Sequence, residues 1–373
     1  MYIKNAVIFL LALIFFAAAL NFGQPEHKTL EIGSKAPDFN LQGIDGKYYS
    51  LNSFSKAKIL VIIFTANHCP TAQAYEDRII SLTNDYKDKG VDVVCISSNN
   101  PQALRLDEMG YTDLGDTKEE MKIRAKDKGF NFPYLYDGDK QEVAEEYGPQ
   151  ATPHVFIFDK DRILRYTGRI DNSEKIQNVT VNDTRNAIDA LLAGKEVPVK
   201  KTKTFGCSLK WAYKKESAKE AVDKWNKEKV ELQSVGLDEI KNILNNYSDN
   251  LRLINIWATW CGPCAAEFPE LVEINRMYRN REFEMVTLST DDISKKDKVQ
   301  KFLEKKYAST KNYQYNSDDK YKLIDAVDKD WSGALPYTLL VKPGGEIIYK
   351  KEGMIDKLQL KKAIVSYLGR YYK

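Results

Sequence analysis

The chain has 373 residues, which is enough for two or three domains of ordinary size. Its 56 Lys and Arg against 53 Asp and Glu leave a formal net charge of +3, and the lysine-rich stretches have acidic residues nearby. This pattern is typical of a solvated surface and predicts no nucleic-acid partner. The five cysteines are too few and too widely spaced for a disulfide scaffold, so we interpret them as reactive positions.

The first residues differ in composition from the rest of the chain. Lys4 precedes a charge-free apolar run over residues 6–20, with small residues at 17–19. Because this is the composition of a secretory signal, we expect a signal peptide or membrane anchor over residues 1–23. The run is short for a membrane span of about 20 residues, which favours cleavage over anchoring. Both outcomes predict a periplasmic or otherwise extracytoplasmic protein, where disulfides persist; without cleavage the segment would anchor it to the inner membrane.

Apolar strand-like runs alternate with amphipathic stretches along the chain, and the same order occurs twice. This alternation predicts an α/β fold with a sheet covered by helices in each copy. The elements expected in the first copy are strands at 59–64, 91–97 and 155–158 and helices at 72–87 and 183–192. The second copy has strands at 253–257, 283–289 and 338–341 and helices at 264–278 and 357–368. Turn residues at 159–162 and 342–345 close one hairpin in each copy.

The two copies are joined by residues of different character. Residues 194–211 are expected to form an extended arm, and residues 214–231 a highly charged helical connection. We therefore divide the chain into a first domain at 30–211, a linker helix at 212–234 and a second domain at 235–373.

A close cysteine pair, Cys261-Gly262-Pro263-Cys264, lies where a buried strand of the second copy turns into a helix. A thiol at a helix N-terminus is favoured as the thiolate, so Cys261 is the expected nucleophile. Cys264 lies within disulfide reach and is expected to resolve the mixed disulfide. Pro263 suits the first helical turn, and Trp260 is expected to shield the sulfur pair. A zinc site would need a second pair of ligands that three histidines do not supply, so we expect neither metal nor cofactor.

The sequence IWATWCGPC at 256–264 resembles the active-site motif of the thioredoxin superfamily, especially its exported TlpA and ResA-like branch. The resemblance covers roughly residues 235–373 and includes a loop similar to the one that carries the family's cis-proline. It implies a cis Pro336 beside the dithiol, with Trp260, Pro263, Leu335 and Pro336 contacting the substrate. It also implies partners that are disulfide-containing or thiol proteins, together with a membrane or soluble thiol reductant.

The first copy, up to about residue 211, resembles the peroxiredoxin and TlpA-like redoxins in its opening hairpin, GSKAPDF at 33–39 followed by DGK at 45–47. Further on, NHCP at 67–70, YGPQATP at 147–153 and GCSLKW at 206–211 look like a bacterial redoxin subgroup. Together the two resemblances imply two thioredoxin-like folds in tandem, each with a central mixed sheet. In the first domain they imply a substrate site at Cys69 that includes His68, Thr152 and Pro153.

Cys69 is expected to have a lowered pKa, because it too lies at a strand-to-helix turn. Ala72 stands three residues later, so Cys69 has no partner of the kind that Cys261 has. Cys207, on a polar arm expected at the surface, is the candidate resolver, although sequence alone leaves their pairing open. Cys95 lies inside an apolar strand, where a free cysteine behaves as a small buried residue.

Three functions remain open from these patterns. The first is an extracytoplasmic thiol-disulfide oxidoreductase in which Cys261 attacks and Cys264 resolves, with the direction of electron flow undetermined. The second is a thiol peroxidase at Cys69, with the second domain as its internal reductant. The peroxiredoxin pattern places a threonine three residues before the reactive cysteine, whereas here Thr65 lies four before it.

The third function is a metal-delivery or substrate-binding role for the first domain. His68, His154 and Cys69 would then hold copper, since imidazole and thiolate are suitable ligands. In the alternative that we favour, His68 tunes the thiol or caps the turn and His154 fills a loop contact. His27 is assigned no specific role.

Overall fold

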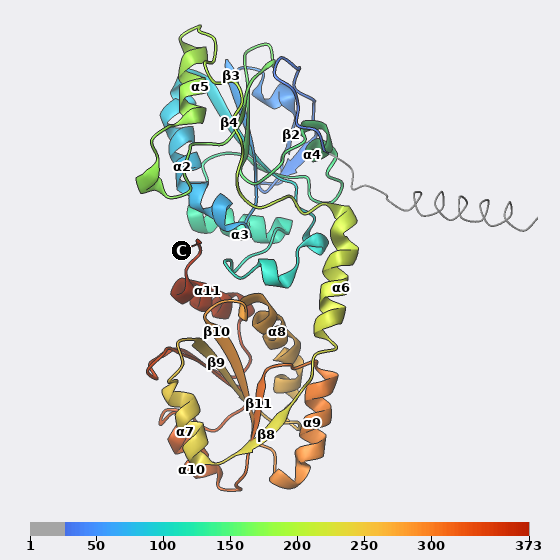
Figure 1. Ribbon diagram of the computed structural model, residues 1–373, viewed down its shortest axis with the longest axis vertical. Helices are drawn as coiled ribbons and strands as arrows, with labels where there is room; N and C mark the ends of the chain where they lie inside the picture. The colour runs from blue at the N-terminus through green and yellow to red at the C-terminus, as the bar shows by residue number, and fades with distance from the viewer. Residues whose placement is uncertain (1–26, 373) are drawn as a thin grey trace, which may run out of the picture.

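The structure is a computed structural model that describes residues 27–372. The signal or anchor expected at residues 1–23 lies outside this range. Two α/β domains are joined by helix α6 (Lys215–Trp225), which runs along one side of the molecule between them (Figure 1). Of the helices in the described range, none combines the length and the apolar character needed to cross a bilayer.

The first domain is built on a seven-stranded mixed sheet in the order β2-β1-β5-β4-β3-β6-β7. The central strands β3, β4 and β5 are parallel, and the others pair antiparallel. Helices α2, α3 and α5 pack on one face, and α4 packs on the other together with Leu209 and Trp211 at the end of the arm that follows α5. The elements are β1 (Leu41–Gly43), β2 (Tyr48–Tyr49), β3 (Ile59–Thr65), α2 (Pro70–Tyr86), β4 (Val91–Ser97), α3 (Lys118–Lys128), β5 (Tyr134–Tyr136), α4 (Glu142–Tyr147), β6 (His154–Phe158), β7 (Leu164–Gly168) and α5 (Asp183–Leu192).

The second domain repeats this plan with a six-stranded sheet in the order β13-β12-β9-β10-β11-β8. Helices α8, α9 and α11 cover one face and α7 and α10 cover the other. The elements are β8 (Leu232–Val235), α7 (Leu237–Asn245), β9 (Leu251–Trp257), α8 (Gly262–Tyr278), β10 (Phe283–Ser289), α9 (Lys296–Lys305), β11 (Lys311–Tyr315), α10 (Lys320–Val327), β12 (Tyr337–Val341), β13 (Ile347–Glu352) and α11 (Lys357–Leu368). Both predicted domains therefore have the mixed α/β architecture expected from the resemblance.

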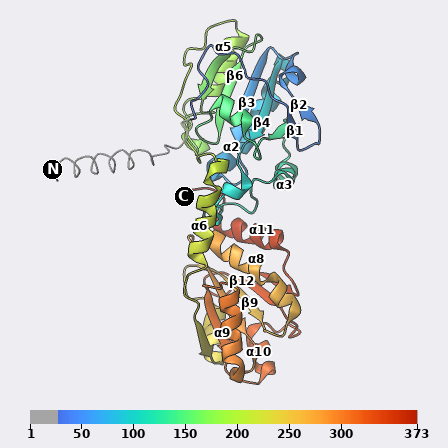
Figure 2. The same cartoon turned by 90° about the vertical axis from the view of Figure 1, so that its right-hand side faces the viewer.

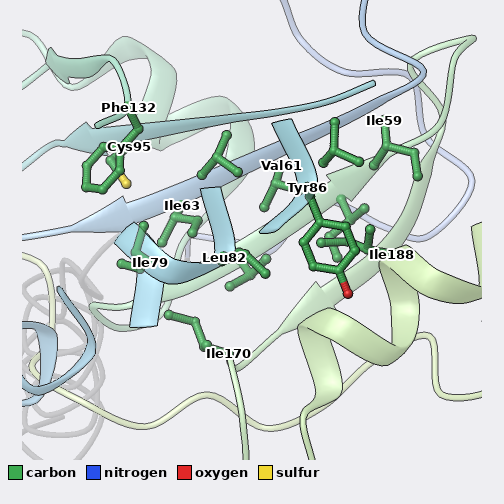
Figure 3. Close-up of a cluster of buried hydrophobic side chains, with 14 of the residues drawn as sticks. Ile59, Val61, Ile63, Ile79, Leu82, Tyr86, Cys95, Phe132, Ile170 and Ile188 are labelled. Atoms are coloured by element: carbon green, nitrogen blue, oxygen red, sulfur yellow. The ribbon is translucent and has the colours of Figure 1, made fainter. Parts of the chain in front are cut away.

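Alternating side chains of the central strands account for the two-layered cores. In the first domain Ile59, Val61 and Ile63 of β3 point to the α2 side, where Ile79 and Leu82 meet them (Figure 3). The residues between them on β3 point to the opposite face. A strand buried on both faces needs such a continuous apolar run. Runs of this kind are the pattern from which the sequence predicts β3 and β9.

The chain between the domains departs from the prediction in three ways. Helix α6 ends at Trp225, whereas a helical stretch was expected as far as residue 231. Strand β8 pairs in parallel with β11, so the second sheet begins inside the region assigned to the linker. The arm after α5 is docked rather than exposed, because Leu209, Lys210 and Trp211 are buried against the first domain. His27 also has a place there, with its ring stacked on Trp211 at 3.5 Å.

The two domains contact each other through an insertion of the first domain, residues 101–116. Met109 of this insertion packs into the core formed by α8, α11 and β9. The Tyr278 hydroxyl at the end of α8 donates to the Thr112 carbonyl at 2.7 Å, and Arg281 donates to the Gly110 carbonyl at 2.8 Å. Figures 1 and 2 both show α8 and α11 at the top of the second domain, directly beneath the first.

Candidate functional site

A disulfide joins Cys261 and Cys264 at the start of α8, with the two Cα atoms 5.3 Å apart. Strand β9 brings the chain to this point, and Cys261 caps the helix by accepting a hydrogen bond from the Cys264 amide at 3.2 Å. Both cysteines are buried, whereas Trp260 beside them is 68% exposed. The predicted nucleophile and its partner are thus in bonding contact, with an exposed aromatic ring next to them.

The loop before β12 completes the surroundings of this disulfide. The Leu335–Pro336 peptide bond is cis, as the resemblance implied. Leu335 packs against the cluster that contains both cysteines, so this loop lies beside the sulfur pair. Within residues 27–372, no strand segment pairs with Leu335. The neighbouring carbonyls of Ala334 and Pro336 accept hydrogen bonds from Trp331 and Gly353, so in the described residues it is Leu335 that has no strand partner beside the disulfide.

A buried acid lies behind the disulfide and was missed from the sequence. Glu267 follows Cys264 by three residues, which places it on the same side of α8. Its carboxylate accepts hydrogen bonds from the Asn255 side chain at 3.1 Å and the Ile355 amide at 2.8 Å. Burial raises the pKa of Glu267, which makes it a candidate proton carrier for the thiols. The signal available in the sequence was an acid at helical spacing from Cys264 on a face that is otherwise apolar.

The first domain has its own sulfur pair, and its members come from distant parts of the chain. Cys69 caps α2 and accepts a hydrogen bond from the Ala72 amide at 3.4 Å, as Cys261 does at α8. Cys207 packs against Cys69, and the Cys69 thiol donates to the Thr152 carbonyl at 3.3 Å. Both are free thiols in the structure. The predicted resolver therefore lies beside its nucleophile, and their disulfide remains a prediction.

The arm carrying Cys207 is held against the loop before β6. The Thr152 amide donates to the Cys207 carbonyl at 2.9 Å, and the Thr152–Pro153 peptide bond is cis. Gly206 has φ +136°, and a Cβ atom there would lie 2.1 Å from the Thr152 carbonyl oxygen. Only glycine allows so close an approach. The backbone edge that is unpaired in the second domain is thus filled in the first by the chain's own cysteine.

His68 and Asp116 form a buried ion pair next to Cys69. The His68 Nδ1 lies 2.5 Å from the Asp116 carboxylate, which also accepts hydrogen bonds from the Asn67 amide at 2.7 Å and the Asn99 side chain at 2.8 Å. Burial alone would lower the pKa of His68, but the carboxylate outweighs it and raises the pKa. The His68 ring, with its pKa raised by this carboxylate, thus lies next to Cys69. Sequence reasoning missed Asp116 because it lies in the insertion, far from Cys69 along the chain.

The Cys69 thiol is expected to ionise readily in this environment. Burial alone would raise the pKa of Cys69, but the Cys207 hydrogen bond and the charge of His68 outweigh it and lower the pKa to about 6. Hydrogen bonding to Cys69 raises the pKa of Cys207. Cys95 differs from both, since burial in the core raises its pKa well above the usual range. The pKa values of the two thiols are thus shifted in opposite directions, downward for Cys69 and upward for Cys207.

The copper alternative does not fit the position of His154. Its Nδ1 accepts a hydrogen bond from the Gln150 amide at 3.1 Å, and its Nε2 lies 3.0 Å from the Thr167 hydroxyl. Burial lowers the pKa of His154 to about 3, so the ring is a neutral part of the core. Across residues 27–372, no three His, Cys, Asp or Glu side chains are grouped so as to hold a metal ion.

Comparison with known proteins relates both halves of the chain to redox proteins. Residues 32–167 match the AhpC/TSA family, and residues 217–364 match the Redoxin family. Thiol-disulfide oxidoreductase ResA of Oceanobacillus iheyensis is 30% identical over 109 residues, which is 29% of this chain and 53% of ResA. The chain thus spans about half the length of this relative.

Two further proteins are similar to parts of the chain. Peroxiredoxin Bcp of Escherichia coli is 27% identical over 150 residues, which is 40% of this chain and 85% of Bcp. The crystal structure of an uncharacterized conserved protein from Geobacillus kaustophilus is 37% identical and covers 51% of this chain and 98% of its own, with a TM-score of 0.44.

Proposed function

The chain belongs to the thioredoxin superfamily, with an AhpC/TSA-family domain followed by a redoxin domain, and from this premise we propose that it is an extracytoplasmic thiol-disulfide oxidoreductase. The observation that carries the proposal is the Cys261–Cys264 disulfide at the N-terminus of α8, beside an exposed Trp260 and an unpaired backbone edge at Leu335. A substrate strand has room to pair at that edge, which would bring its cysteine to the sulfur pair.

The proposed reaction exchanges one disulfide for another. With the pair reduced, the Cys261 thiolate attacks a substrate disulfide, forming a mixed disulfide and releasing one substrate thiolate. Cys264 then attacks the Cys261 sulfur, which restores the protein disulfide and releases the second substrate thiolate. The substrate gains two electrons, and a membrane or soluble dithiol returns them to the protein. The same steps in reverse oxidise a substrate dithiol.

Reduction of insulin disulfides by dithiothreitol tests the proposal. Cys261→Ser should reduce the catalysed rate to background, and Cys264→Ser should accumulate a mixed disulfide visible by mass spectrometry. Cys69→Ser is the matched control, a cysteine at the equivalent turn of the other domain, and should retain the insulin activity. Full activity of Cys261→Ser would reject the second domain as the site.

Export rests on the composition of residues 1–23, with Lys4 before an apolar run. A fusion of these residues to a reporter enzyme that is active only outside the cytoplasm should be active. Replacing two apolar residues of the run by aspartate should abolish reporter activity. A reporter that is inactive with the natural segment would contradict export.

A second candidate function, peroxide reduction by the first domain, is favoured by the lowered pKa of Cys69 and its contact with Cys207. The Cys69 thiolate would attack a peroxide oxygen, forming a sulfenic acid and releasing water or an alcohol. Attack by Cys207 would then give the disulfide and a second water. Peroxide consumption lost in Cys69→Ser but retained in Cys261→Ser, with dithiothreitol as reductant, would support this activity. If Cys69→Ser, Cys261→Ser and the unaltered chain consumed peroxide at the same rate, peroxide reduction at Cys69 would be rejected.

A further inference from the structure

A cavity of about 640 Å³ lies where the two domains meet, and none of the cysteines lines it. Its walls come from three segments, which are residues 101–106 of the first-domain insertion, helix α6 and helix α8. A cavity of this volume is in the range that holds a small organic molecule. An occupant would therefore contact both domains and the helix that joins them.

Apolar side chains from all three segments line this cavity. They include Leu104 and Leu106 of the insertion, Ala218 and Val222 of α6, and Pro269 and Val272 of α8. Apolar surface of this kind gains stability when a ligand removes it from water. The lining therefore favours a ligand with an apolar body.

Arg276 of α8 also lines the cavity, and its buried charge has no carboxylate partner. The residue is only 6% exposed. Its Nη2 donates to the Asn226 side chain at 2.8 Å, whereas its Nε has no hydrogen-bond partner in the described residues. Its guanidinium carbon lies 5.7 Å from the centre of the Trp225 ring. Because a buried charge without a counter-ion is costly, an anion beside Arg276 would be stabilising.

The acids nearest to Arg276 are already paired with other residues. The Glu228 carboxylate accepts two hydrogen bonds from Arg279, at 2.7 and 2.9 Å. Glu273, which lines the cavity, forms an ion pair with Lys357 at 2.7 Å. Burial and the charge of Arg279 lower the pKa of Arg276, and the charge of Glu228 does not offset them.

Two lysines of α6 add positive charge to the cavity. Lys215 and Lys219 both line it, and neither forms an ion pair within residues 27–372. Together with Arg276 they make three unpaired cationic side chains, against Glu216 as the one unpaired acid of the lining in the described chain. The charge of the lining therefore favours an anion.

We propose that this cavity is a binding site for a small organic anion, a carboxylate carried on an apolar body. The Arg276 guanidinium binds the carboxylate, because planar guanidinium and carboxylate groups match in charge and geometry. The apolar body packs on the leucine and valine side chains of the lining. The site does not depend on the proposed redox function, since neither sulfur pair contributes to it.

Titration of the full chain with phenylbutyrate, followed by ligand-observed NMR, tests the site. Phenylbutyrate should bind saturably, with a dissociation constant of about 1 mM or below. Phenylbutanol, which has the same apolar body without the charge, should bind about tenfold more weakly. Arg276→Gln should weaken the binding of phenylbutyrate about tenfold and leave that of phenylbutanol unchanged.

Lys219→Gln and Lys224→Gln form a matched pair on α6, because Lys219 lines the cavity and Lys224 does not. Lys219→Gln should weaken the binding of phenylbutyrate about threefold, and Lys224→Gln should leave it unchanged. Both lysines are exposed, so this comparison decides the matter if Arg276→Gln does not fold. The site is overturned by a lack of saturable binding, by equal affinities for phenylbutyrate and phenylbutanol, by an unchanged affinity in folded Arg276→Gln, or by equal effects of the two lysine replacements.

Discussion

At the residue scale, the two helix-capping cysteines differ in what stabilises them. Cys261 and Cys69 both accept a backbone hydrogen bond in the first turn of a helix. Cys261 has its partner three residues away, whereas Cys69 has the adjacent His68 held by Asp116. In place of a second cysteine in the turn, the first domain thus has the buried His68–Asp116 pair and the thiol of Cys207, which comes from another segment.

The charge on His68 should be visible in the titration of Cys69. With Cys207, Cys261 and Cys264 replaced by serine, the ultraviolet absorbance of the thiolate would report Cys69, because burial raises the pKa of the remaining Cys95 well above its usual range. Losing the Cys207 hydrogen bond should raise the midpoint above the value near 6 of the complete pair. Adding His68→Gln should raise it by about one further unit, because a positive neighbour stabilises the thiolate. As a control, His154→Gln should leave the midpoint unchanged, and an unchanged midpoint in His68→Gln would show that the ring is neutral.

At the scale of elements, the backbone at Cys207 pairs with the loop before β6 in the way that an added strand would. One backbone hydrogen bond and the close contact of Gly206 fix its position. Further along, the Lys210 amide donates to Asn99 at 2.8 Å, the residue that also supports Asp116. Asn99 therefore supports both the arm that carries Cys207 and the carboxylate near Cys69.

Replacing Gly206 should separate the two sulfurs. In Gly206→Ala the new methyl group would overlap the Thr152 carbonyl, so the arm must move away and oxidised Cys69–Cys207 should fall several-fold on disulfide mapping. Gly194→Ala is the matched control, since Gly194 also has a positive φ but nothing within 4 Å of its Cβ position. Equal disulfide yields in the two variants would contradict the fixed position of the arm.

Periodicity predicted the central strands and the helices next to them in both domains, but only part of the site. Strands β4 and β10 and helices α5 and α11 have the expected bounds, because each is long and strongly patterned. Strand β8 was missed because it is a short edge strand with exposed Gln233 and Ser234. Asp116 reaches the surroundings of Cys69 through the insertion. Tertiary packing alone decides such contacts, and no local pattern carries them.

At the scale of the whole molecule, helix α8 connects the Cys261–Cys264 pair to the domain interface. Its first turn holds Cys261 and Cys264, whereas Tyr278 at its last turn contacts the first domain. At 1.5 Å per residue, its 17 residues separate these ends by about 25 Å. Direct exchange between the two sulfur pairs is therefore out of reach in this arrangement.

Electron transfer from Cys261–Cys264 to an oxidised Cys69–Cys207 pair should thus occur between molecules. Its apparent rate constant should rise in proportion to protein concentration when followed by quenched thiol labelling. A mixture of Cys261→Ser/Cys264→Ser and Cys69→Ser/Cys207→Ser chains should react about as fast as the wild-type chain at the same site concentrations. A rate independent of concentration would show that the domains separate and close within one molecule.

The arm that places Cys207 beside Cys69 should also limit the lifetime of any covalent adduct formed on Cys69. A thiol tethered next to its target acts at an effective concentration in the millimolar range or above, so a dilute outside thiol competes poorly. An adduct formed on Cys69 would consequently be short-lived, since Cys207 would displace it before a second partner arrives. The first domain would then go undetected in searches that trap mixed disulfides, unless Cys207 is replaced.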